Sequence, residues 1–363
     1  MKICILTLHS QNNNYGSVLQ AYSLYSYMQE LGHDVTVINY QPYYSNGATS
    51  LKMFVRKLAT NIVFLPQYII RKKNFKRILN REKKTKKYSS YLQLQKADLH
   101  DDIFVIGSDQ VWNPNYLCGN DPAYTFQFIK NRIKISYAAS LGTDALSNEQ
   151  IVELVEKTKS FSNISLREYF SAMQFQKAGR TDAKYVLDPV FLHGREYYRK
   201  LEIKPKTEGY ILAYIMSKDP FIASVVDAIS KKYNKKIIQI GGFAPKCNYD
   251  TFDRTAGPEE FLGFVDHADI VVTSSFHGLA FSHIFEKQFL VVMPHDNTLR
   301  LENLLESFGT TDRIITEINE VSRILDTKIN YQKVNEKIDL LRQESCRYLE
   351  DALINCVEKK NDL

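Results

Sequence analysis

The chain has 363 residues, of which 44% are hydrophobic and 24% are charged, and its formal net charge is +6. This balance is ordinary for a globular protein and excludes a disordered chain, a collagen-like repeat and a coiled-coil rod. At about 150 residues per domain, the length favours two domains.

The positive charge is concentrated in one segment. Residues 71–87 contain ten Lys or Arg and one acid, a local charge of +9, so the rest of the chain is slightly acidic. A chain of this kind is not a general nucleic-acid binder, and we expect no nucleic-acid partner.

The cysteines and the apolar runs indicate a cytoplasmic protein. No two cysteines have the CxxC spacing of a zinc site, and their odd number argues against a disulfide framework. They are Cys4, Cys118, Cys247, Cys346 and Cys356. The first apolar stretch ends before His9, which is too short for a signal peptide. No apolar run reaches the ~18 residues of a membrane span.

The first half of the chain predicts a parallel α/β domain. The segments 3–8 and 34–40 are predicted as buried strands, and the pattern between them predicts a helix over 17–31 that ends at Gly32. Residues 51–95 look helical, aromatic and basic. The remaining predictions are strands from 103 and at 134–142, 164–168 and 185–189, and a helix over 147–161.

The second half repeats the alternation after a polar segment at 193–208 that resembles a linker. Strands are predicted at 210–216, 236–240, 269–275 and 288–293, with helices at 219–233, 257–268 and 276–287. The tail, 319–358, is helical and long enough to cross back onto the first domain. We therefore expect two parallel α/β domains, at 1–192 with a helical basic insertion at about 51–95 and at 209–318, followed by C-terminal helices over 319–363.

The most specific candidate site lies between a predicted strand and a predicted helix. It contains Ser275, Phe276, His277 and Gly278. Backbone N–H groups at a helix N-terminus favour an anion, and a histidine in the first turn can bind or protonate a phosphate or carboxylate. The alternative is a capping serine followed by a packed histidine, and spacing alone leaves both open.

Two further candidates follow predicted strands. Gly107 lets a ligand approach the backbone beside Ser108, and Asp109 can act as an acid or base. The alternative for Asp109 is a helix N-cap. Arg167 is suited to clamp a carboxylate or phosphate, with Glu168 beside it. The alternative for this pair is a surface ion pair.

The first strand-to-helix loop is the fourth candidate. Amides around Asn14, Tyr15 and Gly16 are suited to sugar hydroxyls or an anion, unless the loop is only a polar turn in which Asn takes a positive φ. The chain has no GxGxxG, P-loop or GxSxG motif. It has no DxD-like pair, HExxH or Cys/His cluster, so we expect no metal.

The basic segment has two interpretations. It interleaves Phe75, Ile78 and Leu79 with its charges and follows an apolar stretch, which is compatible with peripheral contact with an anionic membrane at its inner face. The alternative, which the pattern favours, is a solvated helix face.

Eight pieces in chain order resemble the polysaccharide pyruvyl transferase family. They are NYGSVLQAY (14–22), VINY (37–40), FVIGSDQVWNP (104–114), SYAASLG (136–142), SLRE (165–168), VLDPVFL (186–192), ADIVVTSSFHGLAFSHIFEKQF (268–289) and LLESFGTTDRI (304–314). The resemblance implies two Rossmann-like domains facing a cleft, as in the GT-B glycosyltransferases, with the active site in that cleft and a C-terminal helical tail. It also implies transfer of a pyruvyl group from phosphoenolpyruvate to hydroxyls of a cell-surface polysaccharide or its precursor, forming a ketal.

The resemblance suggests roles for the candidate residues. Phosphoenolpyruvate carries a carboxylate and a phosphate, so its site needs cations and an anion-binding helix end. We expect Arg167 to bind these groups, His277 with the backbone of 275–278 to hold the phosphate and act as general acid, and Asp109 to act near the sugar. The acceptor is a sugar or lipid-linked glycan, and no cofactor is expected beyond the donor.

The sequence departs from the family pattern at one position. Many relatives carry Arg two residues before the motif histidine, where this chain has Ser275, and Arg300 is a candidate replacement. The departure keeps a nucleotide-sugar-dependent glycosyltransferase of GT-B-like fold as an alternative, with Glu286 as the candidate nearest a ribose. A non-catalytic glycan-binding or assembly protein is a further alternative, which Asp109, Arg167 and His277 together disfavour.

Overall fold

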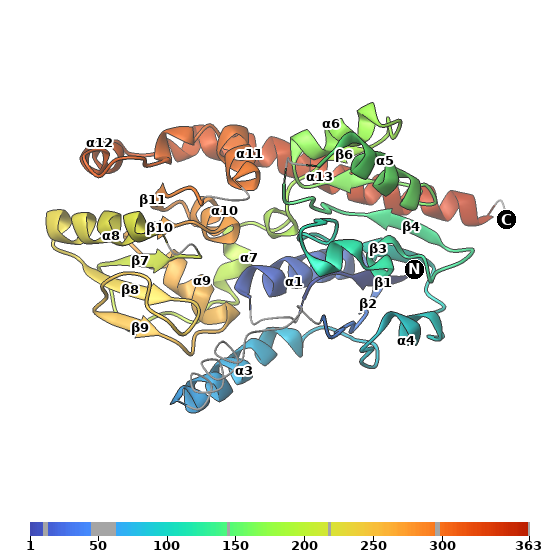
Figure 1. The fold of residues 1–363 in the computed structure, drawn as a ribbon, viewed down its shortest axis with the longest axis horizontal. Helices are drawn as coiled ribbons and strands as arrows, with labels where there is room; N and C mark the ends of the chain where they lie inside the picture. The colour runs from blue at the N-terminus through green and yellow to red at the C-terminus, as the bar shows by residue number, and fades with distance from the viewer. Residues whose placement is uncertain (10–13, 45–62, 144–145, 217–218, 295–297, 362–363) are drawn as a thin grey trace. The chain divides into compact units, whose positions relative to one another are not determined.

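The computed structural model describes residues 1–9, 14–44, 63–143, 146–216, 219–294 and 298–361 (Figure 1). The chain divides into two compact units. Unit 1 is Met1–Tyr44, Leu79–His193 and Ile338–Leu363, and unit 2 is Ser45–Ile78 and Gly194–Lys337. Two features differ from the expected bounds. The described residues 63–78, inside the expected insertion, belong to unit 2, and the expected linker carries a short helix, α7 (Arg195–Arg199).

Unit 1 is built on a parallel sheet of order β2-β1-β3-β4. Its strands are β1 (Lys2–Leu6), β2 (Asp34–Val37), β3 (Ile103–Ile106) and β4 (Ile133–Ser136). A parallel pair, β5 (Ser165–Leu166) and β6 (Lys184–Tyr185), continues it through a bridge between Ala139 and Leu166. The prediction of a parallel α/β fold is confirmed here.

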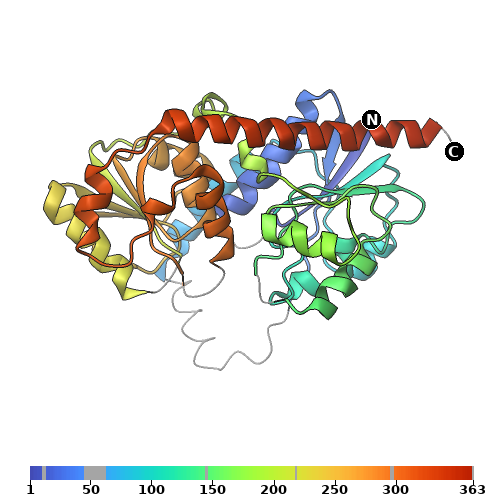
Figure 2. The ribbon, with the colours of Figure 1, turned by 90° about the horizontal axis from the view of Figure 1, so that it is seen from above.

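Helices cover both faces of this sheet (Figures 1 and 2). Because side chains alternate along a strand, Ile3 and Ile5 pack with α1 (Tyr15–Glu30), whereas Cys4 and Leu6 join the opposite core around Trp112. The first face also receives Leu349, Ala352 and Leu353 of the C-terminal helix, α13 (Tyr331–Asn361). The second face lies under α4 (Tyr91–Gln95), α5 (Asn148–Lys157) and α6 (Tyr169–Lys177).

The helical prediction for 51–95 is only partly right, and 51–62 lies outside the described residues. The described part forms α3 (Leu65–Leu79) and α4, but 80–90 runs beside the sheet. Parallel bridges join Lys84 to Val37 and Tyr88 to Tyr40. The backbone groups at the edge of β2 need partners, and this basic segment supplies them, which outweighs its helical pattern.

Unit 2 is a second parallel sheet, of order β11-β10-β7-β8-β9. Its strands are β7 (Tyr210–Tyr214), β8 (Lys236–Ile240), β9 (Thr251–Asp253), β10 (Ile270–Thr273) and β11 (Gln288–Val291). The edge strand β9 was not predicted. One face packs on α8 (Pro220–Tyr233) and α12 (Glu320–Asp326). The helices α9 (Pro258–Asp266), α10 (Phe276–Ile284) and α11 (Leu299–Phe308) complete the unit.

Helix α3 is anchored to unit 2 at the start of α9. Arg77 forms ion pairs with both Glu259 and Glu260, and Asn74 Nδ2 donates a 2.8 Å hydrogen bond to the carbonyl of Thr255. Gly257 lies so close to Asn74 that it has no room for a side chain. Within the described part of the chain, no helix combines the length and the hydrophobicity that crossing a bilayer requires.

Candidate functional site

The predicted residues fall into two groups, one in each unit. In unit 1, the carboxyl ends of β1, β3, β4 and β5 meet at one edge of the sheet, and Asp109 and Arg167 both follow strands there. In unit 2, His277 lies where β10 passes into α10. Ligands of open α/β sheets bind beyond these strand ends, so both groups occupy the expected position in their own sheet.

Asp109 is held in an unusual backbone conformation. Its φ of 77° is in the left-handed region, which costs a non-glycine residue free energy and often marks functional sites. The carboxylate, in a residue only 9% exposed, accepts hydrogen bonds from Ser17 Oγ at 2.5 Å and from the backbone N–H of Gln110 at 2.9 Å. No described helix begins at Asp109, so the alternative interpretation as an N-cap is wrong.

Arg167 is buried, at 2% exposure, so the interpretation as a surface ion pair is wrong. Its Nη1 donates to Asp188 Oδ2 at 2.9 Å, and its Nε lies 3.4 Å from Glu168 Oε1. Burial opposes the guanidinium charge, but the negative charges of Glu168, Asp188 and Asp109 raise its pKa above the ordinary value. One guanidinium thus neutralises part of a cluster of three carboxylates.

Serine hydroxyls complete this polar cluster. Ser108 Oγ donates to Asp188 Oδ2 at 2.9 Å, and Ser140 Oγ donates to Glu168 Oε1 at 2.6 Å. Ser17, Ser140 and Asp188 were not among the predicted site residues. For Asp188 a signal was present, because it is a charged residue near the end of a predicted strand, as Arg167 is; for the serines we see none.

The first strand-to-helix loop is organised by its own side chains. Asn14 is the N-cap of α1 and accepts from the N–H groups of Gly16 and Ser17, with a φ of −92°. The positive φ of the alternative interpretation is therefore absent at Asn14, whereas Asn12 and Asn13 lie outside the described residues. Tyr15 is buried. The serine that meets Asp109 is thus positioned by the cap of α1.

Gly107 has a packing role, and its role in admitting a ligand to the backbone stays a prediction. A Cβ at this position would lie 3.0 Å from the Cβ of Thr7 and 3.2 Å from Leu24 Cδ2. The small residue lets β3 continue past β1 and α1. The neighbouring Ser108 carbonyl accepts a 2.5 Å bond from Thr7 Oγ1, which links the ends of the two strands.

His9 lies at the end of β1 and was not among the predicted site residues. The side chain is buried, and its Nδ1 is 3.2 Å from the carbonyl of Thr7. Its Nε2 has no hydrogen-bond partner among the residues that the structure describes. Burial lowers the pKa of His9 to about 4, so the imidazole is neutral at pH 7.

In unit 2, the candidate site begins with a serine cap. Ser275 is the N-cap of α10, and its Oγ accepts from the N–H of Gly278 at 3.5 Å. The Ser275 N–H donates to Thr273 Oγ1 at 3.0 Å. His277, in the first turn, is 7% exposed, and its ring meets that of Phe276 edge-on, 5.2 Å between centroids. The structure thus contains the cap and the packed histidine, at a helix N-terminus with anion-binding character.

Gly278 brings the start of α10 unusually close to the sheet. A Cβ there would lie 2.3 Å from Thr273 Oγ1 and 2.9 Å from Tyr214 Cδ1. Burial raises the pKa of Tyr214 to about 12, while hydrogen bonding with Ser275 and the charge of Arg71 limit the rise. Arg71, buried on α3, therefore acts electrostatically on the strand end beside this site, although it was predicted only as part of the basic segment.

Two other residues predicted around this site have different surroundings. Arg300 lies in the first turn of α11, which packs against α10, and is half-buried. Glu286 follows the far end of α10, where its carboxylate accepts from Arg195 at 2.9 Å and from Asn335 at 2.7 Å. It is therefore engaged at the end of the helix opposite the candidate anion site.

Among the described residues, Glu202, Asp266 and His267 have ligand atoms within 4.8 Å of one another. Both carboxylate oxygens of Asp266 accept from Arg199, and His267 Nε2 lies 3.1 Å from Glu202 Oε1. These contacts form an ion-pair network between α7 and α9, and we propose no metal there.

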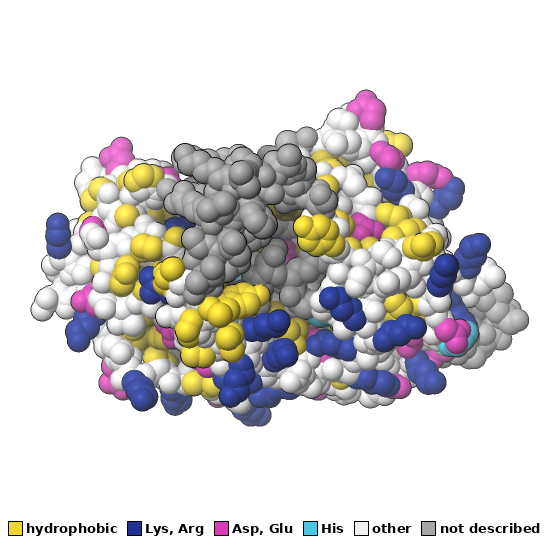
Figure 3. Space-filling view, turned by 60° about the horizontal axis from the view of Figure 1, so that its bottom comes forward, with side chains coloured by type: hydrophobic (Ala, Val, Ile, Leu, Met, Phe, Trp, Pro, Cys, Tyr) yellow, Lys and Arg dark blue, Asp and Glu magenta, His cyan; other side chains and the backbone are white. Residues whose placement is uncertain are grey.

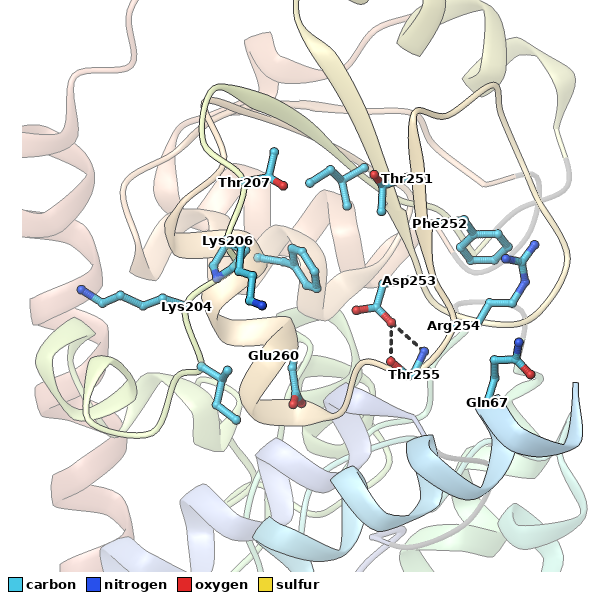
Figure 4. Close-up of a pocket in the computed structure, with 14 residues that line it drawn as sticks. Gln67, Lys204, Lys206, Thr207, Thr251, Phe252, Asp253, Arg254, Thr255 and Glu260 are labelled. Atoms are coloured by element: carbon cyan, nitrogen blue, oxygen red, sulfur yellow. Dashed lines mark hydrogen bonds between the residues drawn. The ribbon is translucent and has the colours of Figure 1, made fainter.

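A cavity of about 470 Å³ in unit 2 contains none of the predicted residues (Figure 4). The two acids of its lining are engaged by the protein itself. Asp253 Oδ1 accepts from the N–H and hydroxyl of Thr255, and Glu260 accepts from the N–H of Gly257 and pairs with Arg77. We do not assign it to the site.

Comparison with known structures shows the class of fold. UDP-N-acetylglucosamine 2-epimerase from Rickettsia bellii aligns with a TM-score of 0.55 and 10% identity, covering 97% of this chain and 96% of that one. The Neisseria meningitidis enzyme, whose structure is bound to UDP-GlcNAc, aligns with 0.53, 11% identity and coverages of 98% and 100%. A putative epimerase from Listeria monocytogenes aligns with 0.55, 10% identity and coverages of 93% and 90%.

At such identities the likeness shows the fold alone, and this chain is an α/β protein of GT-B-like fold. A search of curated proteins found no significant match. A sequence profile described as polysaccharide pyruvyl transferase matches residues 14–297, which is most of the chain. The chain belongs to the polysaccharide pyruvyl transferase family and is a transferase.

Proposed function

We propose that this transferase moves a pyruvyl group from phosphoenolpyruvate to two hydroxyls of a sugar, forming a ketal on a cell-surface polysaccharide or its precursor. The observation that carries the proposal is His277 in the first turn of α10, at a helix end suited to an anion, in a chain of this family. The site residues below are part of the proposal.

The donor's phosphate binds at the N-terminus of α10. The helix dipole and the N-terminal amides favour its negative charge, and His277 contacts a phosphate oxygen. Ser275 stands where many family members carry an arginine. Arg71 supplies positive potential close to this position, because its charge acts on Tyr214, which is hydrogen-bonded with Ser275. Arg300, in the first turn of α11, is the second candidate for that missing cation.

The chemistry requires one proton to be delivered and two to be removed. The enol of the donor takes a proton at its methylene carbon, which becomes the methyl group, and a sugar hydroxyl adds to the adjacent carbon as it loses its own proton. The C–O bond to phosphate then breaks, and a second hydroxyl adds there and loses its proton. His277 is the proposed general acid, and Asp109 the proposed base toward the acceptor.

Arg167 was predicted to bind the donor's anionic groups, and that role remains a prediction. The structure supports a second role, in which Arg167 holds the carboxylates in place. Its Nη1 bonds to Asp188, and its Nε contacts Glu168. With Asp109, these carboxylates exceed the single guanidinium charge by a formal two units. We therefore assign the donor phosphate to α10 and the acceptor, a sugar or lipid-linked glycan, to the Asp109 edge of unit 1.

A thermal-shift titration with phosphoenolpyruvate, UDP and GDP tests the proposal. A ligand at a hundredfold excess over its dissociation constant adds ~2.7 kcal/mol to the free energy of unfolding. We expect a shift with phosphoenolpyruvate that His277→Ala abolishes, and loss of turnover by orders of magnitude in that variant. A shift with UDP or GDP and none with phosphoenolpyruvate would refute it.

That second outcome would support the alternative, a nucleotide-sugar-dependent glycosyltransferase of the same fold. The observation in its favour is that the Neisseria meningitidis neighbour is bound to UDP-GlcNAc. Against it, Glu286, the residue predicted nearest a ribose, pairs with Arg195 at the other end of α10.

A further inference from the structure

Helix α3 has a buried face and an exposed face of very different composition. Arg71, Phe75 and Ile78 form its buried face. On the other side, Leu65 is 50% and Ile69 is 58% exposed. Ile70 is also exposed, whereas the ring of Tyr68 packs against Phe243. The next turns carry exposed lysines at the same helical spacing, namely Lys72, Lys73 and Lys76.

The exposed face therefore changes from apolar to cationic along one helix, and α3 contains no acidic residue. In Figure 3, hydrophobic side chains lie directly beside a group of Lys and Arg side chains on this side of the molecule. The orientation of α3 on unit 2 is fixed, because Asn74 and Arg77 bond to residues at the start of α9.

We propose that this face of α3 docks on the surface of a membrane that contains anionic lipid. The apolar turn, with Leu65 and Ile69, enters the boundary between headgroups and acyl chains. The lysines Lys72, Lys73 and Lys76 meet anionic headgroups, so the charges of the two surfaces are complementary. The side chains needed are among the described residues.

On sequence alone, the whole basic segment 71–87 was a candidate for membrane contact, and the structure reduces the number of residues available for it. Arg71 is buried, and Arg77 is paired with Glu259 and Glu260. In unit 1, Lys83 pairs with Asp34 and Lys84 pairs with Glu82. The docking surface is therefore the outer face of α3, over 65–76, rather than the whole basic segment.

Other occupants fit the face less well. A soluble polyanion, such as an acidic glycan or nucleic acid, pairs with the lysines but leaves Leu65 and Ile69 in water. In a symmetric dimer, the same face of a second copy would pack here, and a pairing of equivalent residues would place lysines against lysines, which repel one another. A bilayer with anionic headgroups satisfies both halves of the face at once.

The proposal does not depend on the donor, because none of these residues belongs to the proposed site. It also gives the acceptor a location, since a lipid-linked glycan is held at the surface on which α3 would dock. Membrane docking and pyruvyl transfer are measured separately, so failure of one leaves the other standing.

Flotation with phosphatidylcholine vesicles, with and without phosphatidylglycerol, tests the docking. We expect the full chain to float only with phosphatidylglycerol vesicles at low salt, and less as salt rises. Replacing the three lysines, as Lys72→Gln/Lys73→Gln/Lys76→Gln, should weaken vesicle binding about a hundredfold. The double variant Leu65→Ser/Ile69→Ser should weaken it even at low salt.

Two control variants match these changes elsewhere on the surface. Lys177→Gln/Lys231→Gln/Lys236→Gln removes three exposed lysines from other elements, and Leu340→Ser removes an exposed leucine of α13. Both should float like the unchanged protein. Thermal unfolding of every variant checks that the fold is retained.

The proposal is overturned if the chain does not float with phosphatidylglycerol vesicles at low salt, or if the control triple weakens binding as much as the α3 triple. Equal flotation with pure phosphatidylcholine vesicles would contradict the proposed binding of the lysines to anionic headgroups. Light scattering without vesicles measures whether the chain self-associates. Self-association that Leu65→Ser/Ile69→Ser abolishes would overturn the proposal and assign the face to a second copy of the chain.

Discussion

Asp109 combines backbone strain, burial and a short hydrogen bond from Ser17. Asparagine tolerates the left-handed region well, so Asp109→Asn should keep the fold and remove only the basic oxygen. We expect turnover to fall about 10²- to 10⁴-fold while the thermal shift with phosphoenolpyruvate is retained. Asp98→Asn, at an exposed carboxylate, is the control. Lost donor binding in Asp109→Asn would move this residue to the donor site.

Arg167 is a buried cation whose removal has two consequences. Arg167→Ala leaves Asp188 and Glu168 without their counter-charge, which should cost about 3–5 kcal/mol of unfolding free energy. Turnover should fall by orders of magnitude in the fraction that remains folded. Arg167→Lys should recover part of the stability but not turnover, because lysine cannot reach both carboxylates with a planar fork.

The control for this pair of variants is Arg323→Ala, at an exposed i,i+3 pair with Glu320, which should change stability by less than about 1 kcal/mol. Thermal unfolding and phosphate release from phosphoenolpyruvate measure both effects. Wild-type stability and rates in Arg167→Ala would contradict both the positioning role and the donor role.

At the scale of elements, the position of α10 against the sheet depends on Gly278, although the helix itself does not require a glycine there. A methyl group at Gly278 would meet Thr273 Oγ1 and Tyr214 Cδ1, so Gly278→Ala should displace the start of α10 at a cost of about 1–3 kcal/mol. The shift with phosphoenolpyruvate should shrink because the amides move with the helix. Gly194→Ala, where no atom lies within 4 Å of the new Cβ, is the matched control. Equal unfolding temperatures in the two variants would contradict this packing argument.

Elements were predictable where the local pattern agreed with the tertiary surroundings. The segments 3–8 and 210–216 are almost entirely apolar, and 34–37 alternates polar with apolar residues; each contains a parallel strand. The pattern failed at 80–90, where pairing with β2 replaces a helix, and at β9, whose residues Thr251–Asp253 are too polar to signal a strand. Pairing with a neighbouring strand is a long-range interaction, so these short edge segments have no local signature.

At the scale of the whole molecule, buried histidines link stability to pH. Burial lowers the pKa of His9 and His193 to about 4 and that of His283 to about 3, from an ordinary value near 6.5. Below pH 6.5 these histidines therefore bind protons in the unfolded chain but not in the folded one, and their contribution lowers the unfolding free energy as the pH falls. Between pH 7.5 and 5.5 each histidine should cost about 1.4 kcal/mol.

Urea unfolding at the two pH values measures this loss, and His193→Gln should reduce it by about one histidine's share. Exposed His100, replaced in the same way, is the control, because its ring is mostly in water in both states. A pH dependence that His193→Gln leaves unchanged would contradict a neutral His193 in the folded chain.

The sequence by itself determined the class of fold, the family and the position of the candidate residues at strand ends. These properties follow from apolar runs, helix periodicity and short motifs, all of which are local. Only the tertiary structure decided what these residues contact. Arg167 lies among carboxylates, and Ser17 donates to Asp109, which is 92 positions away in the chain. Gly107 allows close packing, and Arg71 is buried although it belongs to the basic segment. These contacts join segments far apart in the chain, and their free energies depend on burial and on neighbouring charges, which no local pattern contains.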